Sequence, residues 1–218
     1  MLIETPPRQA RWSERAPEIV AAMGSLALSV VVLALRPLPN NDGVYYLLTA
    51  DAFARHGLSA ASAIHPWPFH SVLIAGAAAV FGVSTELAAQ GIGALLLAVA
   101  SAAFVAIARA LGADRRVAWL ATVVVLCHPW LNRTRALIVR DGGVWALGLL
   151  ALLLVLRSDQ GRRVRALAGW AACSALAVLF RPEAAALMVG APLAIAIASD
   201  MERRKRWMVA IVLILPAL

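Results

Sequence analysis

This sequence has little charge, little lysine and little cysteine. Only 15% of its 218 residues are charged, whereas 62% are hydrophobic, and the mean hydropathy is +0.80. A soluble domain of this length is usually about 45–50% apolar. The shortage of charge therefore argues against a soluble domain and predicts an all-α integral membrane protein.

Motifs for metal, redox and nucleotide chemistry are also missing. The two cysteines, Cys127 and Cys173, lie inside apolar runs, and no CxxC pair occurs, so we expect small buried apolar residues. His65, His70 and His128 lack the spacing of a metal set and are expected at a membrane interface. We see no Gly-rich phosphate loop. We therefore predict no cofactor; a divalent metal is possible but is not predicted.

The charge that is present is mostly arginine. The net charge is +8, with a single lysine among 20 basic residues. In a soluble protein this excess could indicate nucleic-acid binding. The basic residues instead fall in short clusters between apolar runs, and no basic surface with aromatic residues is visible, so no nucleic-acid partner is expected. The Ala- and Arg-rich usage indicates a GC-rich bacterial genome.

Apolar runs predict a multi-span bundle of about six or seven transmembrane helices. A polar lead, residues 1–18, precedes the first span, Ile19–Arg36, which has no clear cleavage site. The later runs are 86–108, 117–131, 136–156, 166–180, 184–199 and 207–218. The given sequence stops at Leu218, inside the last apolar run. Because a terminal carboxylate inside hydrocarbon is costly, we expect residues 1–218 to be one module of a longer protein, or the last helix to be re-entrant.

The basic clusters predict the topology. Four basic clusters occur, at 8–15, 109–116, 157–165 and 203–206. The run 71–83 is short for a span, and if it does not cross, all four clusters share one face, which the positive-inside rule makes cytoplasmic. We therefore expect 71–83 to lie at the outer surface. The N-terminus is then cytoplasmic, and the loop 37–85 is external. Within this loop, Gly43–His56 has helical apolar spacing and ends at Gly57, so we expect an amphipathic helix along the membrane.

Seven ionisable residues are expected at the outer face, namely Asp42, Arg133, Arg135, Arg140, Asp141, Arg181 and Glu183. Each has a plain structural alternative. Asp42 could cap the following helix, Arg140 and Asp141 could neutralise each other, and Arg133 and Arg135 could be solvated loop charges. Arg181 and Glu183 could form an ion pair across Pro182. Together, an acid and several arginines at the end of a bundle suit an enzyme that acts on a lipid-linked phosphate.

The order of these segments resembles the C-type (GT-C) glycosyltransferases, in particular the protein mannosyltransferase and lipid A aminoarabinose transferase-like family. That family's first outer loop reads roughly Asp-x-x-Tyr and then a helix ending in Gly, as in Asp42–Gly57. The remaining matches are His65–Gly82, Ala108–Gly112, Asp141 and Arg181–Glu183. The sequence departs from the family at Gly43, where a second acid is common, and in having a Pro-x-Pro stretch instead of adjacent prolines.

The resemblance implies transfer of a sugar from a polyprenyl-phosphate carrier to a lipid, glycan or protein acceptor. Asp42 would be the general base, and the two arginines that hold the leaving phosphate would be Arg140 and Arg181. The substrate-binding residues would be Tyr45, Tyr46, Arg140, Asp141, Arg181 and Glu183. The site would face the periplasm or exterior of a bacterial inner membrane.

Two other functions remain open at this stage. A lipid-phosphate flippase or transporter subunit predicts charges along a path through the bilayer and little effect of Asp42→Asn. A membrane scaffold with interfacial helices predicts no response to polyprenyl phosphate.

Overall fold

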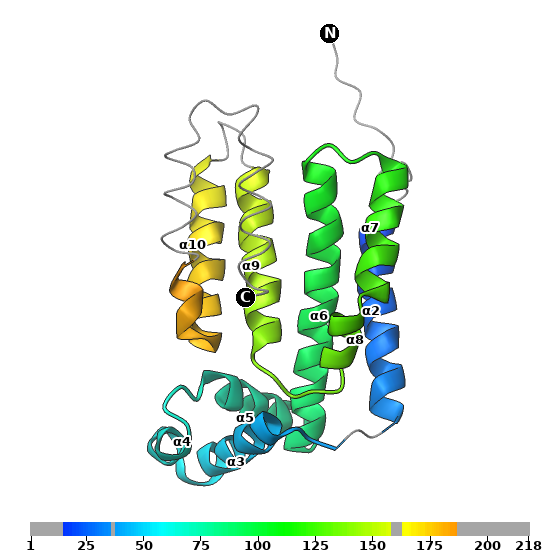
Figure 1. The fold of residues 1–218 in the computed structure, drawn as a ribbon. Helices are drawn as coiled ribbons and strands as arrows, with labels where there is room; N and C mark the ends of the chain where they lie inside the picture. The colour runs from blue at the N-terminus through cyan, green and yellow to red at the C-terminus, as the bar shows by residue number, and fades with distance from the viewer. Residues whose placement is uncertain (1–14, 36–37, 158–162, 187–218) are drawn as a thin grey trace.

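The computed structural model describes residues 15–35, 38–157 and 163–186, and every regular element within them is a helix. Five helices form a bundle (Figure 1): α2 (Ala16–Ala34), α6 (Thr85–Ala110), α7 (Arg115–Cys127), α9 (Asp141–Leu156) and α10 (Arg163–Phe180). Helix α6 packs against α2, α7 and α9, and α10 packs against α9. The predicted helical class is thus found.

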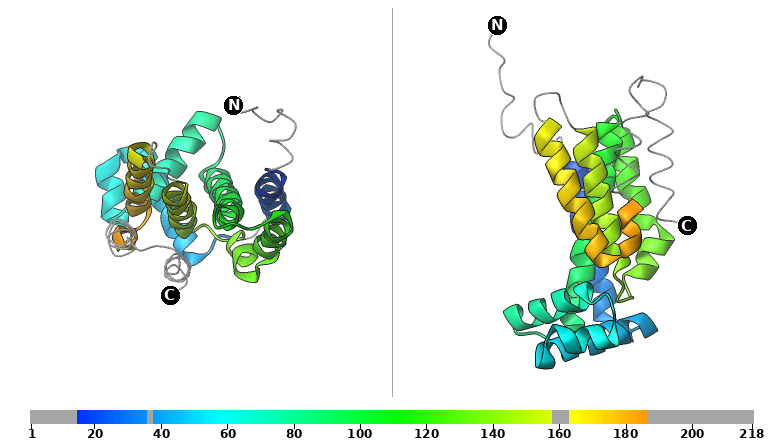
Figure 2. Two further views of the ribbon diagram at one scale, coloured as in Figure 1. Left: turned by 90° about the horizontal axis from the view of Figure 1, so that it is seen from above. Right: turned by 90° about the vertical axis from the view of Figure 1, so that its left-hand side faces the viewer.

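A second layer of short helices lies across one end of the bundle (Figures 1 and 2). It consists of α3 (Asn41–His56), α4 (Leu58–Ile64) and α5 (Phe69–Phe81). We call this end the loop end, because the predicted outer loop 37–85 forms the layer that covers it. Helices α2, α7 and α10 finish at the loop end, and α6 and α9 begin there. Helix α5 packs on α3, α6 and α10. Most of the run 71–83, which was expected at the outer surface and not across the membrane, therefore belongs to this crosswise layer.

Local sequence explains where several helices begin and end. Ser84 Oγ accepts a hydrogen bond from Leu87 N at 3.2 Å to start α6, and Asp114 Oδ1 accepts one from Val117 N at 2.8 Å to start α7. Gly57 ends α3 with a φ of +80°, a value that favours glycine. The predicted helix and its end at Gly57 are confirmed.

Apolar side chains pack in two regions. Ala21, Val105, Ala118 and Val125 join α2, α6 and α7. At the loop end, a cluster that includes Tyr46, Ile74 and Ile138 joins the crosswise layer to the bundle. Burial of this apolar surface fixes the short helices against the ends of the long ones.

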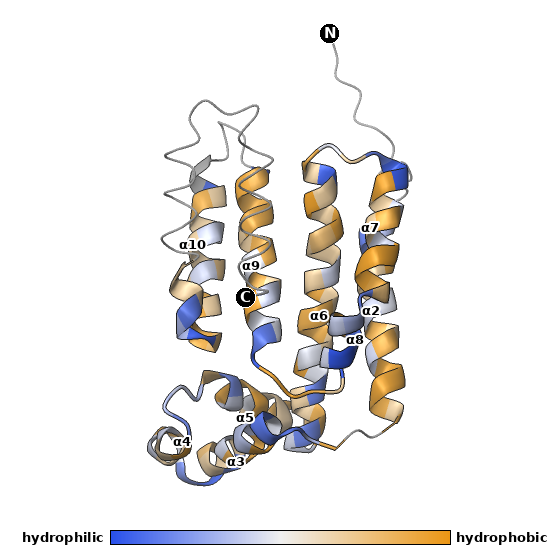
Figure 3. Ribbon diagram, in the orientation of Figure 1, coloured by the Kyte–Doolittle hydropathy of each residue, from blue (hydrophilic) through white to orange (hydrophobic). Residues whose placement is uncertain are grey.

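Within the described ranges, two helices, α2 and α6, are long and apolar enough to cross a membrane, while α5, α9 and the last 16 residues of α10 are apolar but shorter. Figure 3 shows the hydrophobic colouring of α6, α7 and α9, with hydrophilic residues near both ends of α6 and at the starts of α7 and α9. The predicted run 117–131 is interrupted, because α7 ends at Cys127 and α8 (Pro129–Thr134) follows. The run 207–218 and most of 184–199 lie outside the described residues.

The end opposite the loop end is basic, and we call it the basic end. Its basic residues include Arg15, Arg109, Arg115, Arg116, Arg157 and Arg165. Arg109 Nη1 pairs with Glu18 Oε1 at 2.9 Å and so joins the end of α6 to the start of α2. The predicted gathering of basic clusters on one face thus holds for the described part of the chain.

Candidate active site

Asp42 lies in the first turn of α3 with its side chain exposed. The capping alternative is wrong, because the residue at the N-cap position is Asn40 and no side chain caps this helix. Within the described ranges, the Asp42 carboxylate makes no hydrogen bond or ion pair. A capping role therefore does not explain the position of Asp42.

Asn40 and Gly43 hold the start of α3 against the segment before α9. Asn40 Oδ1 accepts a hydrogen bond from Ile138 N at 2.9 Å. A Cβ atom on Gly43 would lie 2.7 Å from Asn40 Oδ1 and 3.0 Å from Ile138 Cβ, which is too close. A larger residue at Gly43 would therefore require Asn40 or Ile138 to shift. The contact also brings Asp42 toward the start of α9.

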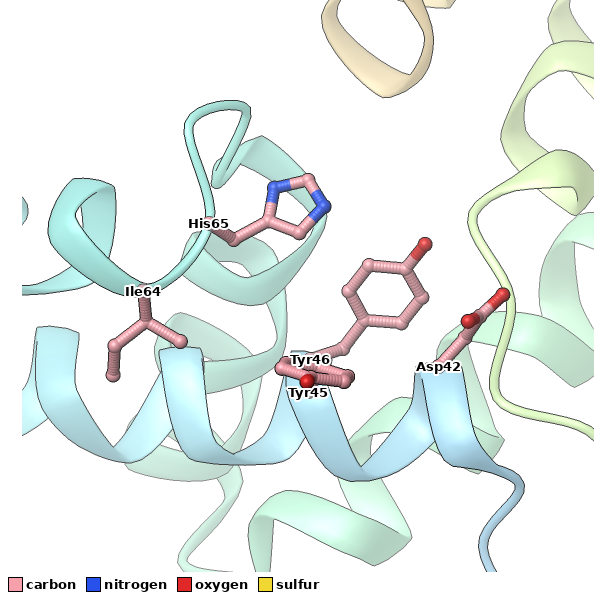
Figure 4. Close-up of a pocket in the computed structure, with 5 residues that line it drawn as sticks. All are labelled: Asp42, Tyr45, Tyr46, Ile64 and His65. Atoms are coloured by element: carbon pink, nitrogen blue, oxygen red, sulfur yellow. The ribbon is translucent and has the colours of Figure 1, made fainter.

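A pocket of about 280 Å³ opens beside Asp42 and is lined by Asp42, Tyr45, Tyr46, Ile64 and His65. In Figure 4 the Tyr46 ring stands between Asp42 and His65, and its hydroxyl points to the same side of α3 as the Asp42 carboxylate. The Tyr45 side chain is exposed, with 59% of its surface accessible. The two predicted tyrosines and the predicted base thus share one pocket, while their roles stay predictions.

Tyr46 is the centre of an aromatic cluster. Its ring centroid lies 5.6 Å from that of His65 and 5.3 Å from that of His70, the latter edge-on. Burial raises the pKa of Tyr46 above 10, a shift that the Arg140 charge opposes. The Tyr46 hydroxyl therefore keeps its proton at neutral pH and can donate a hydrogen bond.

Both histidines of this cluster are neutral at pH 7. Burial and then the Arg140 charge lower the pKa of His65, and the same causes lower that of His70 to about 4. His65 Nδ1 accepts a hydrogen bond from Trp67 N at 3.1 Å, which leaves the proton on Nε2. His70 is 2% exposed, and neither ring nitrogen has a partner in the described part of the chain. His70 is therefore buried among protein side chains, while its expected position at the membrane interface stays a prediction.

Arg181 joins the start of α9 to the end of α10. Its Nη1 donates to Asp141 Oδ1, and its Nε lies 3.4 Å from Glu183 Oε2. The predicted ion pair between Arg181 and Glu183 is present, but the suggested pairing of Arg140 with Asp141 is wrong. Asp141 instead pairs with an arginine that is 40 residues distant.

Arg140 is a cation at the loop end, directly before α9. Its guanidinium makes no hydrogen bond or ion pair with any residue that the structure describes. Its charge nevertheless reaches the surrounding groups. The pKa of Glu183 is lowered, first by a hydrogen bond from its own backbone N–H and also by the charges of Arg181 and Arg140. Arg140 is thus placed to attract an anion at the loop end.

Arg135 differs from the other loop arginines. It is 7% exposed, and its Nη1 donates to Ser25 O at 2.8 Å and to Ser25 Oγ and Ser29 Oγ at 2.9 Å. The solvated-charge alternative is therefore wrong for Arg135, which ties the segment before α9 to α2. Arg133 is exposed and lies over the Trp130 ring at 5.8 Å.

Sequence reasoning missed the roles of His65, Trp67 and His70. All three belong to the stretch His65–His70, which the sequence assigned to the membrane interface. The dense proline and aromatic content between two helices was the available signal. It marks a segment that packs between α3 and α10.

No group of three His, Cys, Asp or Glu side chains in the described ranges could hold a metal ion.

Comparison with known proteins identifies the family. Residues 64–218 match the model of the dolichyl-phosphate-mannose-protein mannosyltransferase family, which covers more than half of the chain. Neither a curated protein nor a solved structure matches the sequence. The matched segment contains Arg140, Asp141, Arg181 and Glu183 and starts after Asp42 and the tyrosines, which only the geometry adds to the site. The chain belongs to the dolichyl-phosphate-mannose-protein mannosyltransferase family of C-type glycosyltransferases.

Proposed function

We propose that this protein transfers a sugar from a polyprenyl-phosphate carrier to an acceptor, with Asp42 as the general base. One observation carries the proposal. Asp42 and Arg140 come from distant parts of the chain, lie at the same end of the bundle and have no hydrogen-bond or ion-pair partners among the described residues. An acid and a cation left uncommitted in this way suit a substrate that brings both a hydroxyl and a phosphate.

The basic end supports an orientation for the site. Arginines from the ends of all five bundle helices gather there, and the positive-inside rule favours the cytoplasm for such an end. The loop end would then face the periplasm or exterior of a bacterial inner membrane. We propose about six or seven transmembrane helices in all, with 184–199 and 207–218 completing the set.

The proposed reaction is a displacement at the anomeric carbon of the sugar. The acceptor oxygen forms a bond to that carbon while Asp42 takes the acceptor proton. The bond between the anomeric carbon and the phosphate oxygen breaks, and its electron pair leaves with the lipid phosphate. Negative charge therefore grows on the phosphate, where a fixed arginine stabilises the transition state. We propose no cofactor and no metal for this step.

Arg140 is the better first ligand for the phosphate. Arg181 is already engaged by Asp141 and Glu183, so it must give up part of that interaction to bind another anion. Arg140 carries no such cost. We therefore assign the main phosphate contact to Arg140 and a supporting contact to Arg181, while Tyr45 and Tyr46 face the sugar or the acceptor.

The chain fits this function better than the two alternatives. A transporter would need charges along its path, yet residues 142–156 and 166–180 contain no acidic or basic residue. A scaffold gives no reason for an uncommitted acid and an uncommitted arginine at one end. The partners that follow are a polyprenyl-phosphate sugar, a lipid, glycan or protein acceptor, and membrane lipids.

Lipid-phosphate binding tests this assignment. We expect undecaprenyl phosphate to raise the melting temperature of the detergent-purified protein in a saturable way. Arg140→Ala should weaken binding about 10- to 100-fold, because a hydrogen bond to a charged group contributes about 1.5–3 kcal/mol. Arg133→Ala, which removes an exposed arginine at the same end, is the control. Equal losses in the two variants would contradict a specific site at Arg140.

A further inference from the structure

The linker between α4 and α5 is bound to the end of α10. Trp67 Nε1 donates a shared hydrogen bond to Leu179 O at 2.7 Å and to Val178 O at 3.1 Å. The last carbonyl groups of a helix have no partner within the helix itself. One indole N–H from the crosswise layer therefore caps the helix end that leads directly into Arg181.

Phe180 reinforces this connection. Its ring lies 5.2 Å from that of Phe69 in an edge-on arrangement and 5.8 Å from that of His70. On its other side it packs so tightly on Gly143 that a Cβ atom there would overlap the ring. Phe180 is 5% exposed, so it is fixed between α5 and α9.

These contacts set where the charged pair at the loop end lies. Arg181 follows Phe180 directly, and Asp141 lies two residues before Gly143. The packing of Phe180 against Gly143 thus sets the distance between the end of α10 and the start of α9. This is the distance that the side chains of Arg181 and Asp141 span when they pair. The Trp67 hydrogen bond ties the same helix end to the layer that carries Asp42.

We propose that Trp67 is a positioning residue that holds Arg181 in place for the lipid phosphate. The inference rests on the proposed function, because it assigns Arg181 to that ligand. Trp67 acts through the end of α10 and does not itself touch the phosphate. The consequence is that a change at Trp67 weakens phosphate binding only while Arg181 is present.

The test uses Trp67→Phe, which keeps an aromatic ring and removes the N–H donor. A lost hydrogen bond of about 0.5–1.5 kcal/mol corresponds to roughly 2- to 10-fold weaker binding of undecaprenyl phosphate. Trp130→Phe is the matched control, because Trp130 is 58% exposed and packs against Arg133 instead of α10. We expect the control to bind as the wild type does.

A double variant separates positioning from general stability. Adding Trp67→Phe to Arg181→Ala should cause no further loss of affinity, whereas independent effects would add. Phe69→Leu removes a Phe180 contact but keeps the indole N–H, and it should show the same dependence on Arg181. This second variant keeps the test valid if Trp67→Phe does not fold.

The outcomes distinguish the two proposals. If the wild type binds undecaprenyl phosphate and Trp67→Phe binds it equally well, this inference is overturned and the proposed function stands. Additive losses in the double variant would have the same consequence. A folded wild-type protein that does not bind undecaprenyl phosphate would overturn both.

Discussion

The buried imidazole of His70 should destabilise the protein, and His70→Phe should therefore stabilise it at neutral pH. His70 is 2% exposed, and neither of its ring nitrogens has a hydrogen-bond partner in the described part of the chain. A buried polar group without a hydrogen bond costs about 1–3 kcal/mol. Phenylalanine has a similar planar ring and can pack against Tyr46 and Phe180. We expect a higher melting temperature, by about 2–4 °C per kcal/mol.

The same residue predicts a pH dependence. Burial and then the charge of Arg140 lower the pKa of His70 from 6.5 to about 4, while the nearby Asp141 opposes the shift. Between these values the unfolded chain binds a proton that the folded protein excludes, so stability falls as the pH drops from 6.5 toward 4. A pKa lowered from 6.5 to about 4 corresponds to a loss of about 3 kcal/mol of stability. His70→Phe removes this loss.

Thermal unfolding in detergent between pH 7.5 and 4.5 measures both effects. His56→Gln supplies the control, because it removes an exposed imidazole at the end of α3 and leaves the buried cluster intact. The reasoning is refuted if His70→Phe is less stable than the wild type at pH 7.5 and the two proteins lose stability in parallel at lower pH.

Two further substitutions test the contacts that place Asp42 and Arg140. Gly43→Ala should destabilise by about 1–3 kcal/mol through its overlap with Asn40 and Ile138, while Gly76→Ala, which meets no atom within 4 Å, should stabilise by about 0.5–1 kcal/mol. Thermal unfolding that ranks the two in the opposite order would contradict the close approach at Gly43. Arg135→Lys should cost about 1.5–3 kcal/mol, because a single ammonium group cannot reach both the α2 oxygens that accept from Nη1 and Asn132 Oδ1, which accepts from Nε at 3.0 Å. If denaturation shows no loss, the Arg135 contacts do not stabilise the fold.

Local patterns were enough to predict much of the fold. Apolar runs and turn residues located the helix Gly43–His56 and its end at Gly57, and the alternation of runs predicted which ends meet. The pairing of Arg181 with Glu183 was also predictable, because only Pro182 separates them. These features depend on neighbours in the sequence, which periodicity and turn chemistry describe well.

Features that depend on distant partners were not predictable. Asp141 pairs with Arg181 and not with its neighbour Arg140, because α9 and α10 meet at the loop end. Arg135 is buried because two serines of α2 accept its hydrogen bonds. His70 is buried because Phe180 closes over it. Each outcome is set by helix packing that composition and spacing do not encode.

Turnover by Asp42→Asn tests the central claim most directly. Release of undecaprenyl phosphate from a glycosylated carrier would be measured in membranes that supply the acceptor, with Asp51→Asn on the same helix as the control. Loss of a general base predicts turnover about 10²- to 10⁴-fold slower, with binding of undecaprenyl phosphate unchanged within about twofold. Turnover by Asp42→Asn equal to that of the wild type and of Asp51→Asn would contradict the account.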